Sequence, residues 1–145
     1  MMNLKRIVGL DFGMRRIGIA ISDPMRSFAT PLEKFERTKN LENDIQALVK
    51  SLSQRGEIEM FIVGLPLHLD GKESEMSKHA REFAKRLEET TGIPCELIDE
   101  RMTSRAAEGL LMELSMSRKS RAKAVDSVSA SLILQTYLDL NSCIK

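Results

Sequence analysis

Acidic residues that follow two separate apolar runs are the first candidates for chemistry in this sequence. Asp11 comes directly after the run Ile7–Leu10, and Asp99 and Glu100 come directly after the run Cys95–Ile98. Neighbouring strand residues face opposite ways, so only one of Asp99 and Glu100 can readily share a site with Asp11. Considered singly, a turn aspartate or a surface ion pair explains each of them equally well.

A third carboxylate, Asp126, belongs to the first turn of the last predicted helix. Counting in helical steps places it in line with Ala130, Ile133 and Tyr137, a mostly apolar face. An aspartate on that face points toward the sheet, where an unpaired charge costs free energy unless a cation or a donor meets it. The register therefore favours a bound cation beside Asp126.

Three carboxylates at one point repel one another, whereas a hard dication such as Mg²⁺ or Mn²⁺ turns that repulsion into ligation. Two such ions about 4 Å apart activate water and stabilise the leaving oxygen in phosphodiester hydrolysis. Residues 117–123 lie just before Asp126 and contain four basic side chains and no acidic one: Arg118, Lys119, Arg121 and Lys123. This segment suits a phosphate backbone, although a solvated basic loop is the more ordinary alternative.

Strands and helices alternate along the chain after an opening hairpin, which predicts an α/β fold: a mixed sheet with helices on both faces. The predicted strands span residues 6–10, 17–22, 28–35, 60–64 and 95–98. The predicted helices run from Leu41 to a stop at Gly56, then over 74–90, 103–114 and 123–140, with 117–123 as a basic loop. Residues 13–16 form the hairpin turn, and Pro31 places the third strand at an edge or a bulge.

Length and composition predict one domain over residues 1–145, with 42% hydrophobic and 30% charged residues. Aromatic residues make up only 4%, which disfavours base stacking as the main mode of nucleic-acid binding, and a net charge of +1 leaves the partner open. Cys95 and Cys143 have no metal-ligand spacing, as expected in a reducing cytoplasm. No uncharged run approaches the roughly 20 residues that span a bilayer, so no membrane partner is expected.

Four blocks of sequence occur in an order that carries a family resemblance. They are Gly9–Gly13 with Arg16–Ala20, Val63–Leu67 with Asp70 and Gly71, Asp99–Ser104, and Val125–Ser127 leading into Ser129–Gln135. On these blocks the chain resembles the YqgF family, described as pre-16S rRNA nucleases and as Holliday junction resolvase-like. The resemblance covers nearly the whole chain.

The resemblance implies an RNase H-like fold and a metal-dependent endonuclease. Its acidic trio carries over to Asp11, Glu100 and Asp126 as catalytic ligands of Mg²⁺ or Mn²⁺, and Asp99 is the alternative to Glu100. The expected substrate is nucleic acid, with pre-16S rRNA, cut at its 5′ end in ribosome biogenesis, favoured over branched DNA. The residues expected to contact the substrate backbone are Arg16, Arg101, Arg118, Lys119, Arg121 and Lys123.

Two other classes of function compete with this prediction. One is a nucleotide-binding protein of the actin-like ATPase type, where a strand followed by Asp-x-Gly also cradles phosphates; 145 residues are too few for its two-lobed cleft. The other is a non-catalytic RNA-binding or transcription factor that keeps the fold, which the three intact carboxylates disfavour.

Overall fold

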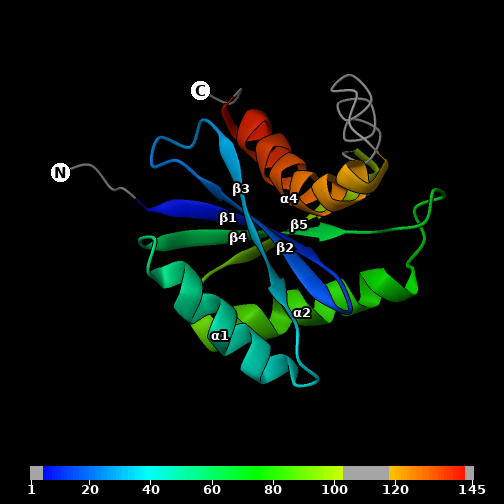
Figure 1. The fold of residues 1–145 in the computed structure, drawn as a ribbon, viewed down its shortest axis with the longest axis horizontal. Coiled ribbons are helices and arrows are strands. Elements are labelled where there is room, and N and C mark those ends of the chain that lie inside the picture. Colours follow the sequence, from blue (N-terminus) through cyan, green and yellow to red (C-terminus); the bar gives the residue numbers. More distant parts are fainter. Residues whose placement is uncertain (1–4, 103–117, 143–145) are drawn as a thin grey trace.

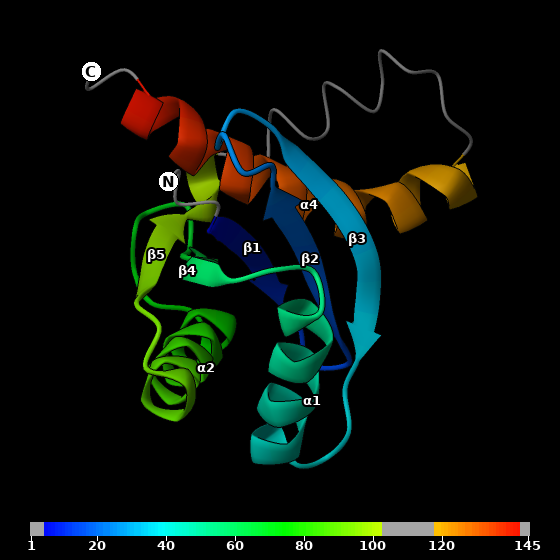
Figure 2. The same ribbon diagram turned by 90° about the vertical axis from the view of Figure 1, so that its left-hand side faces the viewer.

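The computed structural model describes residues 5–102 and 118–142, with residues 102, 118–128 and 142 described as backbone only. A five-stranded mixed sheet forms the middle layer. Helices α1 and α2 cover one face and α4 covers the other, as Figures 1 and 2 show from two directions. This arrangement confirms the predicted α/β fold with helices on both faces.

The strands are ordered β3-β2-β1-β4-β5 across the sheet. Their bounds are β1 Arg6–Phe12, β2 Arg16–Ser22, β3 Ala29–Glu36, β4 Ile58–Leu65 and β5 Cys95–Asp99. β1, β2 and β3 pair antiparallel, whereas β4 runs parallel to both β1 and β5. The carboxyl ends of β1, β4 and β5 therefore meet at one edge of the sheet, where ligands of open α/β sheets bind.

The turn between β1 and β2 depends on a glycine. The Gly13 N–H donates to the Arg16 carbonyl at 2.9 Å, and a Cβ at Gly13 would stand 2.6 Å from that oxygen. At the far edge, Pro31 of β3 lies opposite Ala20, and the pairing register shifts between Ile17 and Ile19. The structure thus confirms both the hairpin and the irregular edge strand.

Helices α1 (Leu41–Ser53) and α2 (Glu75–Thr91) begin at side-chain caps. Asn40 accepts from the Asn43 N–H, Ser74 accepts from the Ser77 N–H, and α2 ends at a left-handed Gly92. The two helices enclose the larger core against β1, β2 and β4, with fully buried side chains that include Ile45, Leu48, Phe61 and Phe83.

Helix α4 (Arg118–Ser142) packs on the other face through buried residues such as Ala130, Ile133 and Leu134. It begins earlier than predicted, so residues 118–122 are helical rather than a loop, and Asp126 falls in the third turn instead of the first. The prediction was wrong because no Gly or Pro stands between Arg118 and Asp126, and Arg, Lys and Ala all favour helix.

The predicted helix over 103–114 lies outside the described residues. Among the helices that the structure describes, none is both long and apolar enough to cross a membrane.

Candidate functional site

Asp11 lies near the end of β1 on the face that α4 covers. It pairs with Gly18 of β2, two residues beyond Gly9. A Cβ at Gly9 would stand 2.7 Å from the Leu134 Cβ and 3.0 Å from the Ala130 carbonyl oxygen, so α4 rests directly on the strand there. Side chains alternate along a strand, so Asp11 lies on the same face of the sheet as Gly9. Its carboxylate extends into the space next to the contact between Gly9 and α4.

Glu100 begins the short 3₁₀ helix η1 (Glu100–Met102) that follows β5. Its carboxyl reaches back over β4 and shares a hydrogen bond with Asp11. Gly64 leaves the room for it, since a Cβ there would stand 2.9 Å from both Cγ and Cδ of Glu100. The structure therefore brings together carboxylates that are 89 positions apart along the chain, one after β5 and one on β1.

Burial and the neighbouring carboxylates favour the protonated form of Glu100. Loss of solvent, then the charge of Asp11 and a hydrogen bond donated to it, raise the pKa of Glu100 to about 8; the charge of Asp99 adds a smaller effect. Without a metal, Glu100 and Asp11 therefore share a proton. A bound cation would instead stabilise the ionised form of both carboxylates.

Asp99 is engaged elsewhere. Its carboxylate accepts from the Arg101 guanidinium at 2.6 Å and 2.8 Å, and from the Arg101 backbone N–H at 2.9 Å. These bonds hold the pKa of Asp99 below its usual value. Arg101 in turn donates to the Leu69 carbonyl at 3.2 Å, and its guanidinium lies against Gly71. Of the two adjacent acidic residues, Glu100 is the one in contact with Asp11.

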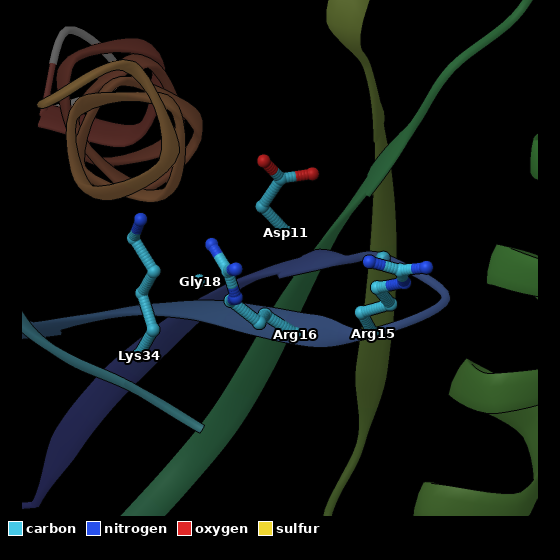
Figure 3. A pocket seen from close by; sticks show the side chains of 6 residues that line it. Asp11, Arg15, Arg16, Gly18 and Lys34 are labelled. Atoms are coloured by element: carbon cyan, nitrogen blue, oxygen red, sulfur yellow. The ribbon is translucent and has the colours of Figure 1, made fainter. Parts of the chain in front are cut away.

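A cavity of about 280 Å³ opens on the other side of Asp11. Its lining is Asp11, Gly13, Arg15, Arg16, Gly18 and Lys34. Figure 3 shows the Asp11 carboxylate, the Arg16 guanidinium and the Lys34 ammonium directed to the side of the sheet where α4 lies, with Arg15 at the turn. Arg16 also pairs with Glu36 at 3.3 Å. Sequence reasoning found Arg16 but missed Arg15, Lys34 and Gly64.

The third predicted carboxylate, Asp126, lies on α4, one helical turn before Ala130, but its side chain is outside the described part of the structure. The same holds for Arg118, Lys119, Arg121 and Lys123. Within the described side chains, no group of three or more acidic, histidine or cysteine residues is brought together for a metal. Their roles therefore stay predictions.

The sequence matches the family model RuvX, described as a Holliday junction resolvase, over residues 5–140. The chain belongs to the RuvX family. This confirms the predicted YqgF/RuvX resemblance and, for the family, a nuclease that hydrolyses phosphodiester bonds.

Curated relatives of this RuvX chain carry the name "Putative pre-16S rRNA nuclease". One from Protochlamydia amoebophila is 43% identical, with 92% of this chain and 93% of its own length covered. Another from Koribacter versatilis is 47% identical, with 92% and 86% covered.

Two solved structures share the fold of the RuvX chain at low sequence identity. Thermus thermophilus RuvC in complex with a Holliday junction substrate matches with a TM-score of 0.57 at 14% identity, over 94% of this chain and 96% of that one. The fowlpox virus Holliday junction resolvase matches with a TM-score of 0.54 at 14% identity, over 92% and 97%.

The donor set of the RuvX chain fits a divalent metal of the hard kind. Asp11 and Glu100 offer carboxylate oxygens, the ligands that Mg²⁺ and Mn²⁺ prefer, from two strand ends. Their shared hydrogen bond shows that the oxygens already lie within reach of one another. The space over Gly64 leaves the Glu100 carboxyl adjacent to Asp11 instead of in solvent.

Proposed function

We propose that this RuvX chain is a divalent-metal-dependent endonuclease whose catalytic residues are Asp11, Glu100 and Asp126. The observation that carries the proposal is the contact between Asp11 and Glu100 at the carboxyl edge of the sheet. Asp126 joins them from α4 on the strength of its helical register. Mg²⁺ or Mn²⁺ bound there would supply an activated water and neutralise charge on the leaving oxygen.

The chain's own residues hold and orient the reacting groups. Asp11 is fixed by the β1–β2 pairing, and Glu100 is fixed by η1 and by its close approach to Gly64. Release of the proton that the two carboxyls share frees both sets of oxygens for ligation. Asp99 and Arg101 brace the turn behind Glu100 and the loop at Leu69.

Backbone phosphates of the substrate contact basic residues around this edge. Arg16 lines the cavity beside Asp11. Four basic residues of the first turns of α4 belong to the same proposed set of contacts: Arg118, Lys119, Arg121 and Lys123. We assign Arg101 to bracing the loop, because its guanidinium is already engaged by Asp99 and Leu69.

The proposed substrate is pre-16S rRNA, cut near its 5′ end in the cytoplasm during ribosome biogenesis. The names of the curated relatives support this substrate. A second candidate is branched DNA, favoured by the description of the family and by the fold likeness to RuvC.

The test compares the two substrates directly. Purified protein is incubated with labelled pre-16S rRNA and with a four-way DNA junction, with Mg²⁺, with Mn²⁺ and with EDTA. We expect metal-dependent cleavage of the rRNA precursor and none by an Asp11→Asn control. Cleavage of the junction alone would shift the proposal to branched DNA, and equal cleavage by the control would refute the assigned site.

A further inference from the structure

The cavity between the β1–β2 turn and β3 lies on one side of Asp11, and Glu100 lies on the other. β2 and β3 provide Arg16, Gly18 and Lys34, whereas Glu100 reaches Asp11 over β4. Asp11 therefore lies between the Glu100 carboxyl and the cavity, whose lining is basic. A nucleic-acid strand bound at Asp11 continues away from it in two directions along the edge of the sheet. One of those directions, toward β2 and β3, leads into this cavity.

The charge of the cavity suits an anion. Among the residues that the structure describes, three cationic side chains and one carboxylate line it: Arg15, Arg16, Lys34 and Asp11. Arg15 and Arg16 are exposed, and Lys34 is half-buried on the edge strand. Arg16 forms an ion pair with Glu36, which offsets part of its positive charge. The remaining positive charge of the lining still favours a phosphate oxyanion over a neutral or cationic ligand.

The turn that forms one wall of the cavity is held by Arg37, whose side chain is mostly covered. The Arg37 guanidinium donates to the Gly13 and Met14 carbonyls, both at 3.2 Å, and the Arg37 N–H donates to the Arg15 carbonyl at 2.8 Å. Arg37 thus binds three consecutive carbonyls of the turn. These bonds fix the backbone from which the side chains of Arg15 and Arg16 extend.

Arg37 is itself immobilised. Its side chain is 9% exposed and pairs at 3.3 Å with Asp44 of α1, which is 1% exposed. Asp44 also accepts from the Thr38 hydroxyl at 2.8 Å, and the guanidinium lies 4.6 Å over the ring of Phe12. A preformed wall loses little conformational entropy when a ligand binds, as a specific subsite requires.

We propose that this cavity is a subsite for a nucleic-acid backbone phosphate adjacent to the cleaved one, with Lys34 contacting that phosphate and Arg37 positioning the turn. The inference rests on the proposed nuclease function and gives it a direction: the substrate backbone crosses from Glu100, past Asp11, toward β3. Contact with phosphate instead of base makes this subsite indifferent to sequence.

The test removes the charge of one substrate phosphate at a time and identifies the phosphate whose contribution to affinity depends on Lys34. A fluorescent oligonucleotide of the cleaved sequence carries one neutral methylphosphonate, moved through every position in turn. Binding to wild type, Lys34→Met and the control Lys50→Met is measured by anisotropy, so the result does not depend on cleavage. Lys50 lies in the last turn of α1, on the opposite face of the sheet.

We expect wild type and Lys50→Met to lose about tenfold in affinity at one position next to the cleaved phosphate, and Lys34→Met to show no loss there. The losses at other positions should stay unchanged in Lys34→Met. Identical scans for wild type and Lys34→Met would overturn the subsite. Cleavage without this coupling would leave the nuclease proposal and remove the subsite. Coupling without cleavage would leave a phosphate-binding cavity and remove the nuclease proposal.

Discussion

The carboxyl of Glu100 occupies the space that the missing side chain of Gly64 leaves, with Cγ and Cδ each 2.9 Å from where a Cβ would stand. This relationship joins β4 to the turn after β5 and keeps Glu100 against Asp11. Under the proposed catalytic role of Glu100, Gly64 would also determine activity although it has no functional group.

Gly64→Ala should therefore displace Glu100 and lower cleavage by about tenfold or more, with a loss of roughly 1–3 kcal/mol in the free energy of unfolding from overpacking. The added Cβ would also stand 2.6 Å from the Cδ1 of Ile133. The double variant with Ile133→Val, which removes that atom, should regain stability in urea denaturation but not activity. Recovery of full activity in the double variant would show that Glu100 is not the group displaced.

The metal-free protein should lose stability as pH rises, because the folded state holds a proton on Glu100 that the unfolded state releases. The pKa of Glu100 is about 8, against an ordinary 4.5. Its contribution is complete below about pH 4.5 and is lost as pH rises to about 8, at no more than ~1.4 kcal/mol per pH unit.

Urea denaturation in EDTA across this range measures the effect, with Glu100→Gln as the control whose slope should be flatter. Added Mn²⁺ should raise stability most at the upper end of the range. A slope unchanged by Glu100→Gln would assign the pH dependence to other groups.

Much of the fold follows from local patterns in the sequence. Alternating apolar residues and the Gly13 turn predicted the hairpin, and Pro31 predicted the irregular edge strand. Strand-end placement put Asp11 and Glu100 at one edge of the sheet. These features depend on a few neighbouring residues, and the structure confirms them.

The remaining features depend on contacts between distant segments. Lys34 belongs to the site only because β3 pairs with β2 and faces the β1–β2 turn, and Gly64 matters only because Glu100 reaches over it. No local pattern marks Lys34 or Gly64 as part of the site. The start of α4 at Arg118 is a different case, because residues 118–122 hold no residue that ends a helix and their local composition accounts for the earlier start.

Arg101→Met should weaken the loop at Leu69 without removing a phosphate contact. The slope of log affinity against log salt should therefore match wild type, whereas Arg16→Met should reduce the slope by about one. Binding titrations at several salt concentrations give both slopes. A reduced slope for Arg101→Met would return Arg101 to the substrate contacts expected from the sequence.

Arg37→Met should cost about 3–5 kcal/mol in the free energy of unfolding, because it leaves the buried Asp44 carboxylate without its cation. Arg37→Met with Asp44→Asn should recover part of that loss, since the unpaired charge is gone. Equilibrium denaturation of the two single variants and the double variant forms the cycle. Strictly additive losses would show that the two residues do not act together.

The central claim is that Asp11, Glu100 and Asp126 act together as a metal-dependent nuclease site. The most direct test is the single-turnover cleavage rate at saturating Mn²⁺ for Asp11→Asn, Glu100→Gln, Asp126→Asn and the neighbouring control Asp99→Asn. We predict that each of the first three loses on the order of 100-fold or more, while Asp99→Asn stays within about fivefold of wild type. Wild-type cleavage by any of the three, or cleavage that persists in EDTA, would contradict the claim.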